Sequence, residues 1–390
     1  MLTLGEIFGP SHAYGPRAHP ATCQWVSDDG YLLDALTCNQ LCIAGDMPVV
    51  CSAGGTSALA IDLMHEAGLA SADCMRLFRG EQEAIDCALD LARNGQRLVV
   101  QHAYPTGVLP AGALWVDASL LAYLNNKANL HELVPDNQRP CRATRSYAEV
   151  FADGGGPALP IVLKVATDLS TGAGAAVAVC RDPRDVAAAA ERFVGCADQL
   201  VVEEYLPIKR NPCLHFAVMP DGAVRYLGFA DQDVTDAGRY CGNWIDVGSV
   251  LARPVVDMAM AVVKRAAALG YRGVVGIDMA MLDDGQTRVL DLNFRINGST
   301  AAVLLAPSIQ NQLGPGLIHL RSFANADPIE QSLAVVREAI RADRLIPLAI
   351  FDADAAGYPD RPARLSAMIL GKTKAHILET ERELATHGWA

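Results

Sequence analysis

The first part of the chain alternates short apolar runs with stretches in which apolar residues recur at helical spacing. This alternation is typical of a parallel sheet with helices on its faces, so we expect an α/β lobe here. Gly54 and Gly55 lie in the turn SAGGTS between a strand and a helix, where they could bind an anion or simply make a tight turn. The predicted strands are residues 47–51 and 97–102, and the predicted helices are residues 58–68 and 81–93.

A small α+β unit is predicted further along the chain. Residues 116–150 are expected to be mostly helical, with breaks at Pro135 and Pro140. The sequence DGGGP at 153–157 predicts a flexible joint, because consecutive glycines resist both helix and strand. Over 158–205 we expect strands at 161–165, 175–180 and 200–205, a small-residue loop at 168–174, and a helix that Asp182 and Pro183 begin and that ends near 193.

The second half is predicted to contain two hairpins. Pro220-Asp221-Gly222 joins strands at 213–219 and 223–230, and Asp283-Asp284-Gly285 joins strands at 274–282 and 287–292. Residues 231–249 are polar and contain glycine, which predicts a long functional loop. The remaining predicted elements are a helix from Pro254 to Gly270, a helix after Ser299, a helix near 329–343, a strand at 345–351 and a helix at 372–386.

Composition narrows the class of protein. The chain has 390 residues, of which 51% are hydrophobic and 19% charged, so it is long enough for two or three lobes with their own cores. The formal charge of −12 without a basic run argues against binding to nucleic acid. We identify no signal peptide and no membrane span, and the 11 scattered cysteines form no CxxC pair. Reduced thiols in a cytoplasmic protein are therefore expected.

A metal site is predicted on the second hairpin. Asp291 and Asn293 are two residues apart and share one face of a strand, and the hairpin can place Asp278 beside them. Two carboxylates and an amide oxygen suit Mg²⁺. Arg295 extends the same face and could stabilise charge on a phosphoryl group or an oxyanion. The alternative is an exposed hairpin face, but both aspartates lie within apolar strands, where an unpaired carboxylate is costly.

Two further motifs are ambiguous when taken alone. Lys164 lies in the apolar strand IVLKV, so it either has an anionic partner or points to solvent from an edge strand. The small-residue loop after it could fold its N–H groups over phosphates. The strand end Glu203-Glu204-Tyr205-Leu206 could pair its backbone with a purine edge, or it could be a solvated strand end.

The order of these motifs resembles the ATP-grasp superfamily, in particular carboxylate–amine ligases such as L-amino acid ligases. The resemblance covers roughly residues 118–312. It implies an α/β fold with an N-terminal Rossmann-like domain at 1–117 and an ATP-grasp domain at 118–327. Within the latter, it implies a small α+β lid at about 157–205 and a central domain. A C-terminal extension at 328–390 would pack on the ATP-grasp core.

The resemblance also implies the cofactors, ATP and two Mg²⁺ ions, with Mn²⁺ as an alternative. Two residues depart from the family pattern: Asn211 stands where a ribose-binding Glu is usual, and Asp291 where the metal ligand is usually Glu. The implied catalytic residues are Arg295 and Lys164. The implied nucleotide-binding residues are Lys127, Lys164, Ser170, Thr171, Gly172, Gly174, Glu203, Glu204, Tyr205, Leu206 and Asn211, and the implied metal ligands are Asp278, Asp291 and Asn293.

Such enzymes phosphorylate a carboxylate and pass the acyl group to an amine, releasing ADP and phosphate. The lid, hinged near 154–156, would protect the acyl phosphate from water. We expect amino acids or small peptides as substrates, and a homodimer is one expected assembly. Candidate substrate residues are Arg239, Trp244 and Asp246 on the predicted loop, together with Arg295, Ser299 and Thr300. The alternatives are an ordinary surface loop for the first three and plain helix capping for Ser299 and Thr300.

Three other functions stay open at this point. A carboxylase-type enzyme would use bicarbonate, and an acid–thiol ligase would need a coenzyme A site, for which the sequence shows no basic patch. A nucleotide-binding regulator without activity would not need Asp278, Asp291, Asn293 and Arg295 together. A Rossmann oxidoreductase is disfavoured, because no GxGxxG fingerprint is present.

Overall fold

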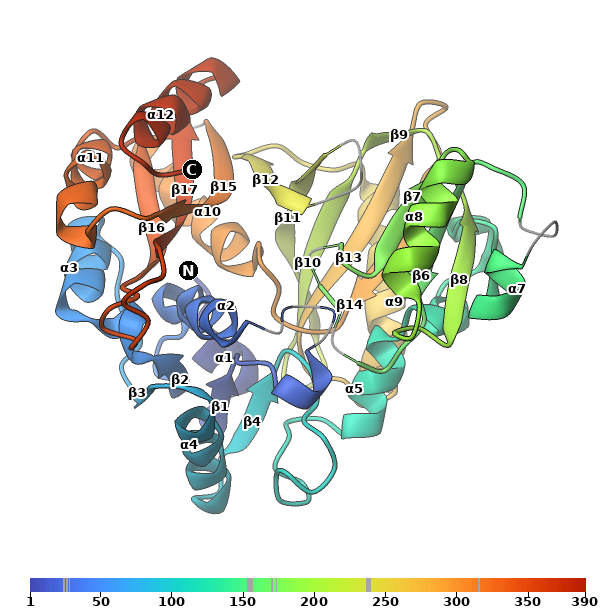
Figure 1. The fold of residues 1–390 in the computed structure, drawn as a ribbon, viewed down its shortest axis with the longest axis horizontal. Helices are drawn as coiled ribbons and strands as arrows, with labels where there is room; N and C mark the ends of the chain where they lie inside the picture. Colours follow the sequence, from blue (N-terminus) through green and yellow to red (C-terminus); the bar gives the residue numbers. More distant parts are fainter. Residues whose placement is uncertain are drawn as a thin grey trace.

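The computed structural model describes residues 1–23, 25, 27, 29–152, 157–169, 171–172, 174–235, 240–314 and 316–390. These residues form three sheets (Figure 1). We call them the N-terminal sheet, the lid sheet and the central sheet. In Figure 1 the N-terminal sheet lies at the lower left, the lid sheet at the right, and the central sheet runs between them to the C-terminal strands at the upper left.

The N-terminal sheet is parallel and has the strand order β3-β2-β1-β4, as the strand–helix alternation predicted. The chain leaves β1 toward β2 on one side and returns as β4 on the other, so the strand order reverses at β1. Ligands of open α/β sheets bind at the carboxyl ends of the strands beside such a reversal. The strands are β1 (His12–Gly15), β2 (Val49–Ser52), β3 (Met75–Phe78) and β4 (Arg97–Val100), with α3 (Ala58–Glu66) and α4 (Glu81–Arg93) between them.

The Gly54–Gly55 turn is a packed turn. A Cβ atom on Gly55 would lie 1.9 Å from Sγ of Cys38, and one on Gly54 would lie 2.5 Å from the carbonyl oxygen of Asp352. The carbonyl of Gly54 also accepts a hydrogen bond from the N–H of Asp352 at 3.0 Å. Both glycines are therefore explained by close packing, Gly55 against Cys38 and Gly54 against the C-terminal part of the chain.

The lid sheet is antiparallel and has the order β5-β8-β6-β7. Its helix α8 (Pro183–Phe193) begins as predicted, with Oδ1 of Asp182 accepting from the N–H groups of Arg184 and Asp185. The prediction of mostly helix over 116–150 was wrong in one segment, because β5 is an edge strand with a largely exposed, polar sequence. The strands are β5 (Arg142–Ser146), β6 (Ile161–Val165), β7 (Val177–Cys180) and β8 (Gln199–Glu204). The expected joint at 154–156 lies outside the described residues.

The central sheet has the order β14-β13-β10-β11-β12-β15-β17-β16, with β9 paired to β13. The predicted loop at 231–249 was wrong in large part, since β11 continues to Val234 and β12 covers Tyr240–Asp246. Two C-terminal strands, β15 and β17, were also missed. The strands are β9 (Ile208–Arg210), β10 (Pro212–Val218), β11 (Val224–Val234), β12 (Tyr240–Asp246), β13 (Gly273–Leu282), β14 (Thr287–Asn293), β15 (Leu317–Asn325), β16 (Leu345–Phe351) and β17 (Ala363–Gly371).

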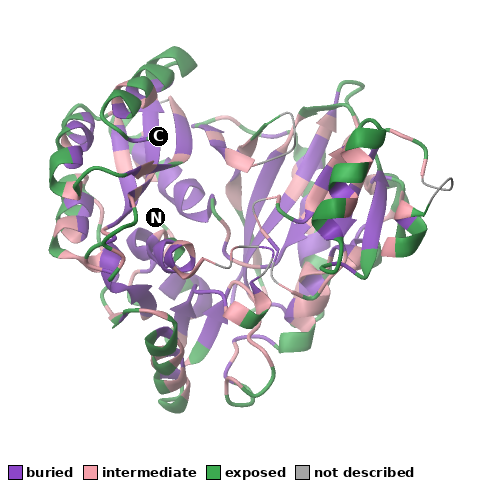
Figure 2. Cartoon of the chain, viewed as in Figure 1, coloured by how far each residue is buried: buried purple, intermediate pink, exposed green. Residues whose placement is uncertain are grey.

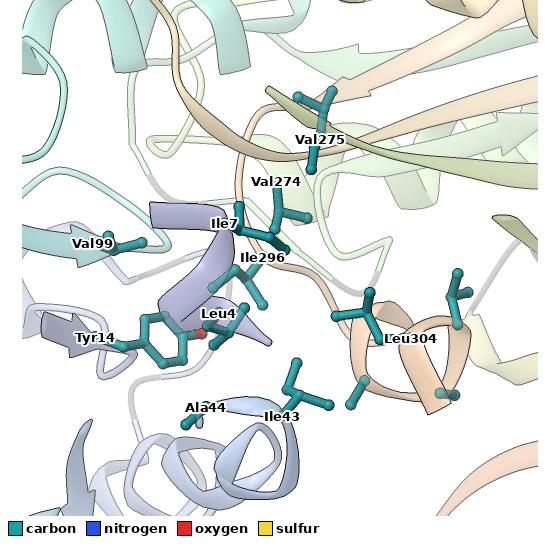
Figure 3. Packing of buried hydrophobic residues seen from close by; sticks show 14 of the residues in the cluster. Leu4, Ile7, Tyr14, Ile43, Ala44, Val99, Val274, Val275, Ile296 and Leu304 are labelled. Carbon is teal, nitrogen blue, oxygen red and sulfur yellow. The ribbon is translucent and has the colours of Figure 1, made fainter. Parts of the chain in front are cut away.

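One apolar core joins the N-terminal lobe to the central sheet. Leu4 and Ile7 of helix α1 lie between Tyr14 of β1 and Val274 of β13 (Figure 3). The lid has a separate core, and the C-terminal strands and helices share another, to which Trp389 belongs. Figure 2 shows the corresponding pattern, with buried strands and helices exposed on their outer faces. The N-terminal lobe and the central sheet therefore share one apolar core, and the lid has its own.

Trp25 is the exception to this separation. It comes from the N-terminal lobe but belongs to the lid core, where its ring meets Phe193 edge to face at 5.8 Å. It also forms an isolated parallel bridge with Thr171. The N-terminal lobe thus contacts the small-residue loop of the lid directly.

The remaining helices are short or cover the sheets, and α3 packs against β16 at the junction with the C-terminal strands. Within the described part of the chain, no helix is long and apolar enough to cross a membrane. All eleven cysteines lie in described residues and are free thiols. The α-helices not yet given are α1 (Leu4–Phe8), α2 (Gly30–Ala35), α5 (Ala118–Asn125), α6 (Leu130–Leu133), α7 (Tyr147–Phe151), α9 (Arg253–Ala268), α10 (Thr300–Leu313), α11 (Ile329–Arg341) and α12 (Lys374–Thr386).

Candidate active site

The carboxylates predicted from the second hairpin lie side by side. Asp278 of β13 is directly opposite Asp291 of β14, and Nδ2 of Asn293 donates to Oδ2 of Asp278 at 3.1 Å. Burial and the neighbouring charge of Asp291 raise the pKa of Asp278. Burial alone would raise the pKa of Asp291 as well, but the charges of Lys127 and Lys164 outweigh it and lower that pKa. The pair is therefore a concentrated acidic site at the centre of the molecule.

This arrangement fits a hard divalent cation. Oδ1 of Asp278 is buried and has no hydrogen-bond partner, so it is a free acceptor at the site. The described residues contain no group of three or more His, Cys, Asp and Glu that could hold a metal. The donor set is thus two carboxylates and the amide of Asn293. Mg²⁺ is commonly bound by one or two carboxylates and completes its shell with water and substrate phosphates.

Two predicted lysines converge on the same strand. Lys127 follows α5 in a short 3₁₀ turn, and its Nζ donates to Oδ2 of Asp291. Lys164 of β6 donates from Nζ to the carbonyl of Leu290 at 2.7 Å and to Oε2 of Glu203 at 2.7 Å. Since the Lys164 residue is only 7% exposed, it does not point to solvent from an edge strand. The lysines of two separate segments therefore meet at β14.

Glu203 makes buried ion pairs that the sequence did not predict. Its carboxylate is buried between Lys164 and Arg142, with Nη1 of Arg142 at 3.3 Å from Oε1. Nη2 of Arg142 also donates to the carbonyl of Lys127. Ion pairs occupy this carboxylate, and in the sheet Glu203 is paired with Arg142 of β5 and Val162 of β6, so a purine would meet the chain beyond it, from Glu204 onward. Arg142 was not predicted as a site residue, since the strand that carries it was missed.

The rest of the predicted adenine segment is more open. Glu204 is exposed, and its Oε1 accepts from the N–H of Cys141 at 2.8 Å. The ring of Tyr205 is 37% exposed and lies 5.7 Å from the guanidinium carbon of Arg181, and Leu206 is half-buried. The segment therefore runs from the last residue of β8 into an open stretch of chain.

Asn211 lies close to the acidic site. Its Nδ2 donates to Oε1 of Gln232 at 3.2 Å, and its Oδ1 is buried without a partner. The Gln232 side chain also hydrogen-bonds Asp278, which lowers the pKa of that carboxyl in part. Gln232 lies on the segment expected to be a loop, so the sequence did not identify it. These contacts leave Asn211 with one free acceptor close to Asp278.

Arg295 is fixed at two points. Its Nη1 donates to Oδ1 of Asn125 at 2.6 Å, and its Nη2 donates to the carbonyl of Thr171 at 3.2 Å. Oδ1 of Asn125 also accepts from the N–H of Phe294 at 3.0 Å. Burial lowers the pKa of Arg295, and the charges of Asp291 and Asp278 oppose that effect. The guanidinium therefore connects the acidic site to the small-residue loop.

The described part of that loop is compact. Thr171 is 7% exposed, and the carbonyl of Gly172 accepts from the N–H of Ala175 at 3.0 Å. Gly174 has a φ of 76°, in the left-handed region that favours glycine. Ser170 lies outside the described residues.

The structure does not place Trp244 and Asp246, two of the predicted substrate residues of 231–249, beside Arg295. Trp244 of β12 stacks on His319 of β15, with ring centroids 3.8 Å apart, and Nζ of Lys374 lies 4.8 Å from its ring centre. Asp246 is an exposed residue at the end of β12. The Trp244 ring is thus occupied by C-terminal residues, and Arg239 lies outside the described residues.

Ser299 and Thr300 are engaged in contacts of their own. Oγ of Ser299 lies 3.0 Å from Nε2 of His215, and Oγ1 of Thr300 contacts Asn297 at 3.1 Å. Ser299 makes no side-chain capping bond to α10, so plain capping does not explain it. Burial lowers the pKa of His215 to about 4. His215 is therefore a neutral, hydrogen-bonded histidine of the interior.

Two family models match this chain. One, described as L-aspartate–L-methionine ligase N-terminal domain, matches residues 3–122. The other, described as L-aspartate–L-methionine ligase, ATP grasp, matches residues 140–293. The second match contains Lys164, Glu203, Asp278, Asp291 and Asn293, and the two together span the N-terminal lobe, the lid and the hairpin of the acidic site.

Solved structures with the same fold include several ligases and a carboxylase. An L-amino acid ligase from Bacillus licheniformis is 12% identical, with 88% of this chain and 91% of that chain covered and a TM-score of 0.53. An N5-carboxyaminoimidazole synthase from Aspergillus clavatus, in complex with ADP and 5-aminoimidazole ribonucleotide, is 14% identical, with 90% and 94% covered and a TM-score of 0.55. A biotin carboxylase from Campylobacter jejuni is 12% identical, with 88% and 86% covered and a TM-score of 0.53. The chain therefore belongs to the L-aspartate–L-methionine ligase family, and it is an ATP-dependent carboxylate–amine ligase of the ATP-grasp type.

Proposed function

We propose that this ligase activates a carboxylate of L-aspartate with ATP and joins the acyl group to the amine of L-methionine. The description of the matching family supports this choice of amino acids. A carboxylate is a poor electrophile, and its acyl phosphate is a good one. The products would be a dipeptide, ADP and phosphate.

The observation that carries the proposal is the convergence of cations on the acidic site. Lys127 and Lys164 meet at β14, and the negative charges of Asp278 and Asp291 act on the guanidinium of Arg295. Phosphoryl transfer is catalysed mainly by positioning and by offsetting charge on the phosphates, which these groups can supply. Asp278, Asp291 and Asn293 would hold two Mg²⁺ or Mn²⁺ ions, which neutralise charge on the transferring phosphoryl group.

Each residue of the site would have its own role in the reaction. Phosphates entering the site give Lys127 and Lys164 new anionic partners, and the segment from Glu204 to Leu206 holds the adenine. Arg295 orients the substrate carboxylate and stabilises the oxyanion that forms when the amine attacks. The lid, which includes Thr171, Gly172 and Gly174, excludes water from the acyl phosphate. Asn211 offers its free amide oxygen to a ribose hydroxyl.

We further propose a cytoplasmic location, which the eleven free thiols support, because such thiols persist under reducing conditions. A homodimer is proposed from the resemblance to this superfamily. Sedimentation of the purified chain at several concentrations tests the assembly.

Product analysis tests the proposed reaction. The purified protein is incubated with Mg²⁺-ATP and with aspartate, methionine or both, and separate tubes contain bicarbonate, or coenzyme A with an acid. We expect ADP, phosphate and a dipeptide that depend on both amino acids together. Formation of AMP and pyrophosphate would overturn the acyl-phosphate route. ADP formation with bicarbonate alone would favour a carboxylase.

A further inference from the structure

His102 lies at the carboxyl edge of the N-terminal sheet. It follows β4 by two residues, and β4 pairs with β1 at the point where the strand order reverses. Main-chain segments at this edge diverge and leave room for a ligand. His102 thus stands at the edge where a substrate of this lobe would meet the rest of the site.

The surroundings of His102 connect it to Arg295. His102 lines a cavity together with Asn125, Asp168 and Thr171. Asn125 and Thr171 are the two residues that accept hydrogen bonds from the guanidinium of Arg295. The cavity therefore borders the group that would hold the carbonyl of the acyl phosphate.

The imidazole of His102 is uncommitted. Within the described part of the chain its ring makes no hydrogen bond, whereas His215 contacts Ser299 and His319 contacts two carboxylates. Burial and the positive charges of Arg295 and Lys127 lower the pKa of His102 well below its usual value. The ring is therefore neutral at neutral pH, and one of its nitrogens keeps a free lone pair that can take up a proton transiently.

The proposed reaction needs such an acceptor. An amino acid arrives as an ammonium ion, which has no lone pair with which to attack. We propose that His102 is a catalytic residue of the second half-reaction and takes one proton from the ammonium of the amine substrate. The freed nitrogen forms the C–N bond, the bond from the acyl carbon to the phosphate oxygen breaks, and the second proton leaves with the phosphate. His102 then returns its proton to solvent. This inference rests on the proposed ligase function.

Asp168 is the nearest rival for this role. It lines the same cavity, but its Oδ1 already accepts a hydrogen bond from Nδ2 of Asn126 at 2.8 Å. Asn126 immediately precedes Lys127, so Asp168 ties the lid to the turn that carries that lysine. This contact gives Asp168 a structural task, and His102 has none.

The test compares two acceptors in His102→Gln. Hydroxylamine is largely uncharged at neutral pH, so it can attack the acyl phosphate without a base. We expect dipeptide formation in H102Q to fall about a hundredfold, the usual contribution of a general base, while aspartyl hydroxamate forms as in the unmodified enzyme. His65→Gln is the matched control, since His65 is an exposed residue of α3 in the same lobe.

The possible results distinguish an error in the role of His102 from an error in the proposed ligase function. If H102Q keeps dipeptide formation, or loses hydroxamate and dipeptide equally, His102 is not the base. If Asp168→Asn rather than H102Q loses only the dipeptide, Asp168 is the base and the inference is wrong. If the unmodified enzyme makes neither ADP nor hydroxamate with aspartate, the proposed function itself fails.

Discussion

At the scale of single residues, the position of Arg295 is the most informative feature of the site. Oδ1 of Asn125 accepts two hydrogen bonds, one from Nη1 of Arg295 and one from the N–H of Phe294. A planar guanidinium with two directed contacts is oriented more firmly than an ammonium could be. The orientation of Arg295 therefore depends on a residue that touches neither substrate nor nucleotide in this account.

This dependence leads to a prediction for Arg295 and Asn125. Arg295→Lys should lower kcat by about 10²–10³-fold, because the oxyanion loses a fixed donor pair. Asn125→Ala should lower kcat by up to about a hundredfold through misplacement of the guanidinium. The double variant should be no slower than R295K alone, since both changes remove one function. Steady-state kinetics of the set provide the measurement, and additive losses would contradict the account.

The sequence predicted the charged centre of the site because local rules were enough. Asp291 and Asn293 share a face of β14 by their spacing of two, the hairpin turn sets Asp278 opposite Asp291, and Arg295 follows just beyond the end of the strand. Asn125, Arg142 and Gln232 could not be found in this way. Their roles arise from contacts with residues distant in the chain, and nothing in their local pattern distinguishes them from surface polar residues.

At the scale of elements, the lid sheet is held by an ion network as well as by its core. Glu203 of β8 lies between Lys164 of β6 and Arg142 of β5, so one carboxylate connects three neighbouring strands. β5 was not predicted, because its sequence is polar and it pairs with another strand on one side only. Tertiary pairing, which a single sequence does not display, decided its conformation.

Removing the central charge of this network should loosen the lid. Glu203→Gln removes the ion-pair partner that the buried Lys164 and Arg142 share, so we expect the free energy of unfolding to fall by about 3 kcal/mol. Glu204→Gln, one residue further and exposed, should change it by less than about 0.5 kcal/mol. Urea unfolding of the two variants makes the comparison. Equal stabilities would show that the network contributes little.

A second prediction at this scale concerns the Gly54–Gly55 turn. Gly55→Ala brings a Cβ atom to within 1.9 Å of Sγ of Cys38, so the free energy of unfolding should fall by about 1–3 kcal/mol with the KM for ATP unchanged. Cys38→Ala in the same chain should recover part of that loss. Thermal unfolding and ATP kinetics test both points. A raised KM at full stability would instead support an anion site at the turn.

At the scale of the whole molecule, the N-terminal lobe and the central sheet share one apolar core, whereas the lid has a core of its own and meets them through polar contacts such as those of Lys164 and Arg295. The predicted α/β alternation and the hairpins were confirmed because hydrophobic periodicity determines them. The sequence did not predict that β15 and β17 extend the central sheet. The residues of a single strand do not show which other strands it will pair with. The separate core of the lid suits an enzyme that must admit substrates and then exclude water.

The buried histidine of the central sheet should make the fold sensitive to acid. Burial lowers the pKa of His215 to about 4, so the folded state keeps the ring neutral while the unfolded chain binds the proton. Its contribution is complete above a pH of about 6.5 and is lost as the pH falls toward about 4, which amounts to about 3 kcal/mol. His215→Gln should therefore lose less stability than the unmodified chain over this range. Parallel losses in urea unfolding would exclude His215 as the cause.

The central claim is that the ligase passes through an acyl phosphate, and oxygen transfer tests it most directly. Aspartate labelled with ¹⁸O in its carboxyl groups is incubated with methionine and Mg²⁺-ATP, and the phosphate and nucleotide are examined by mass spectrometry. The account predicts that each phosphate released with ADP carries one ¹⁸O atom from the activated carboxylate. Unlabelled phosphate, or label found in AMP, would contradict it.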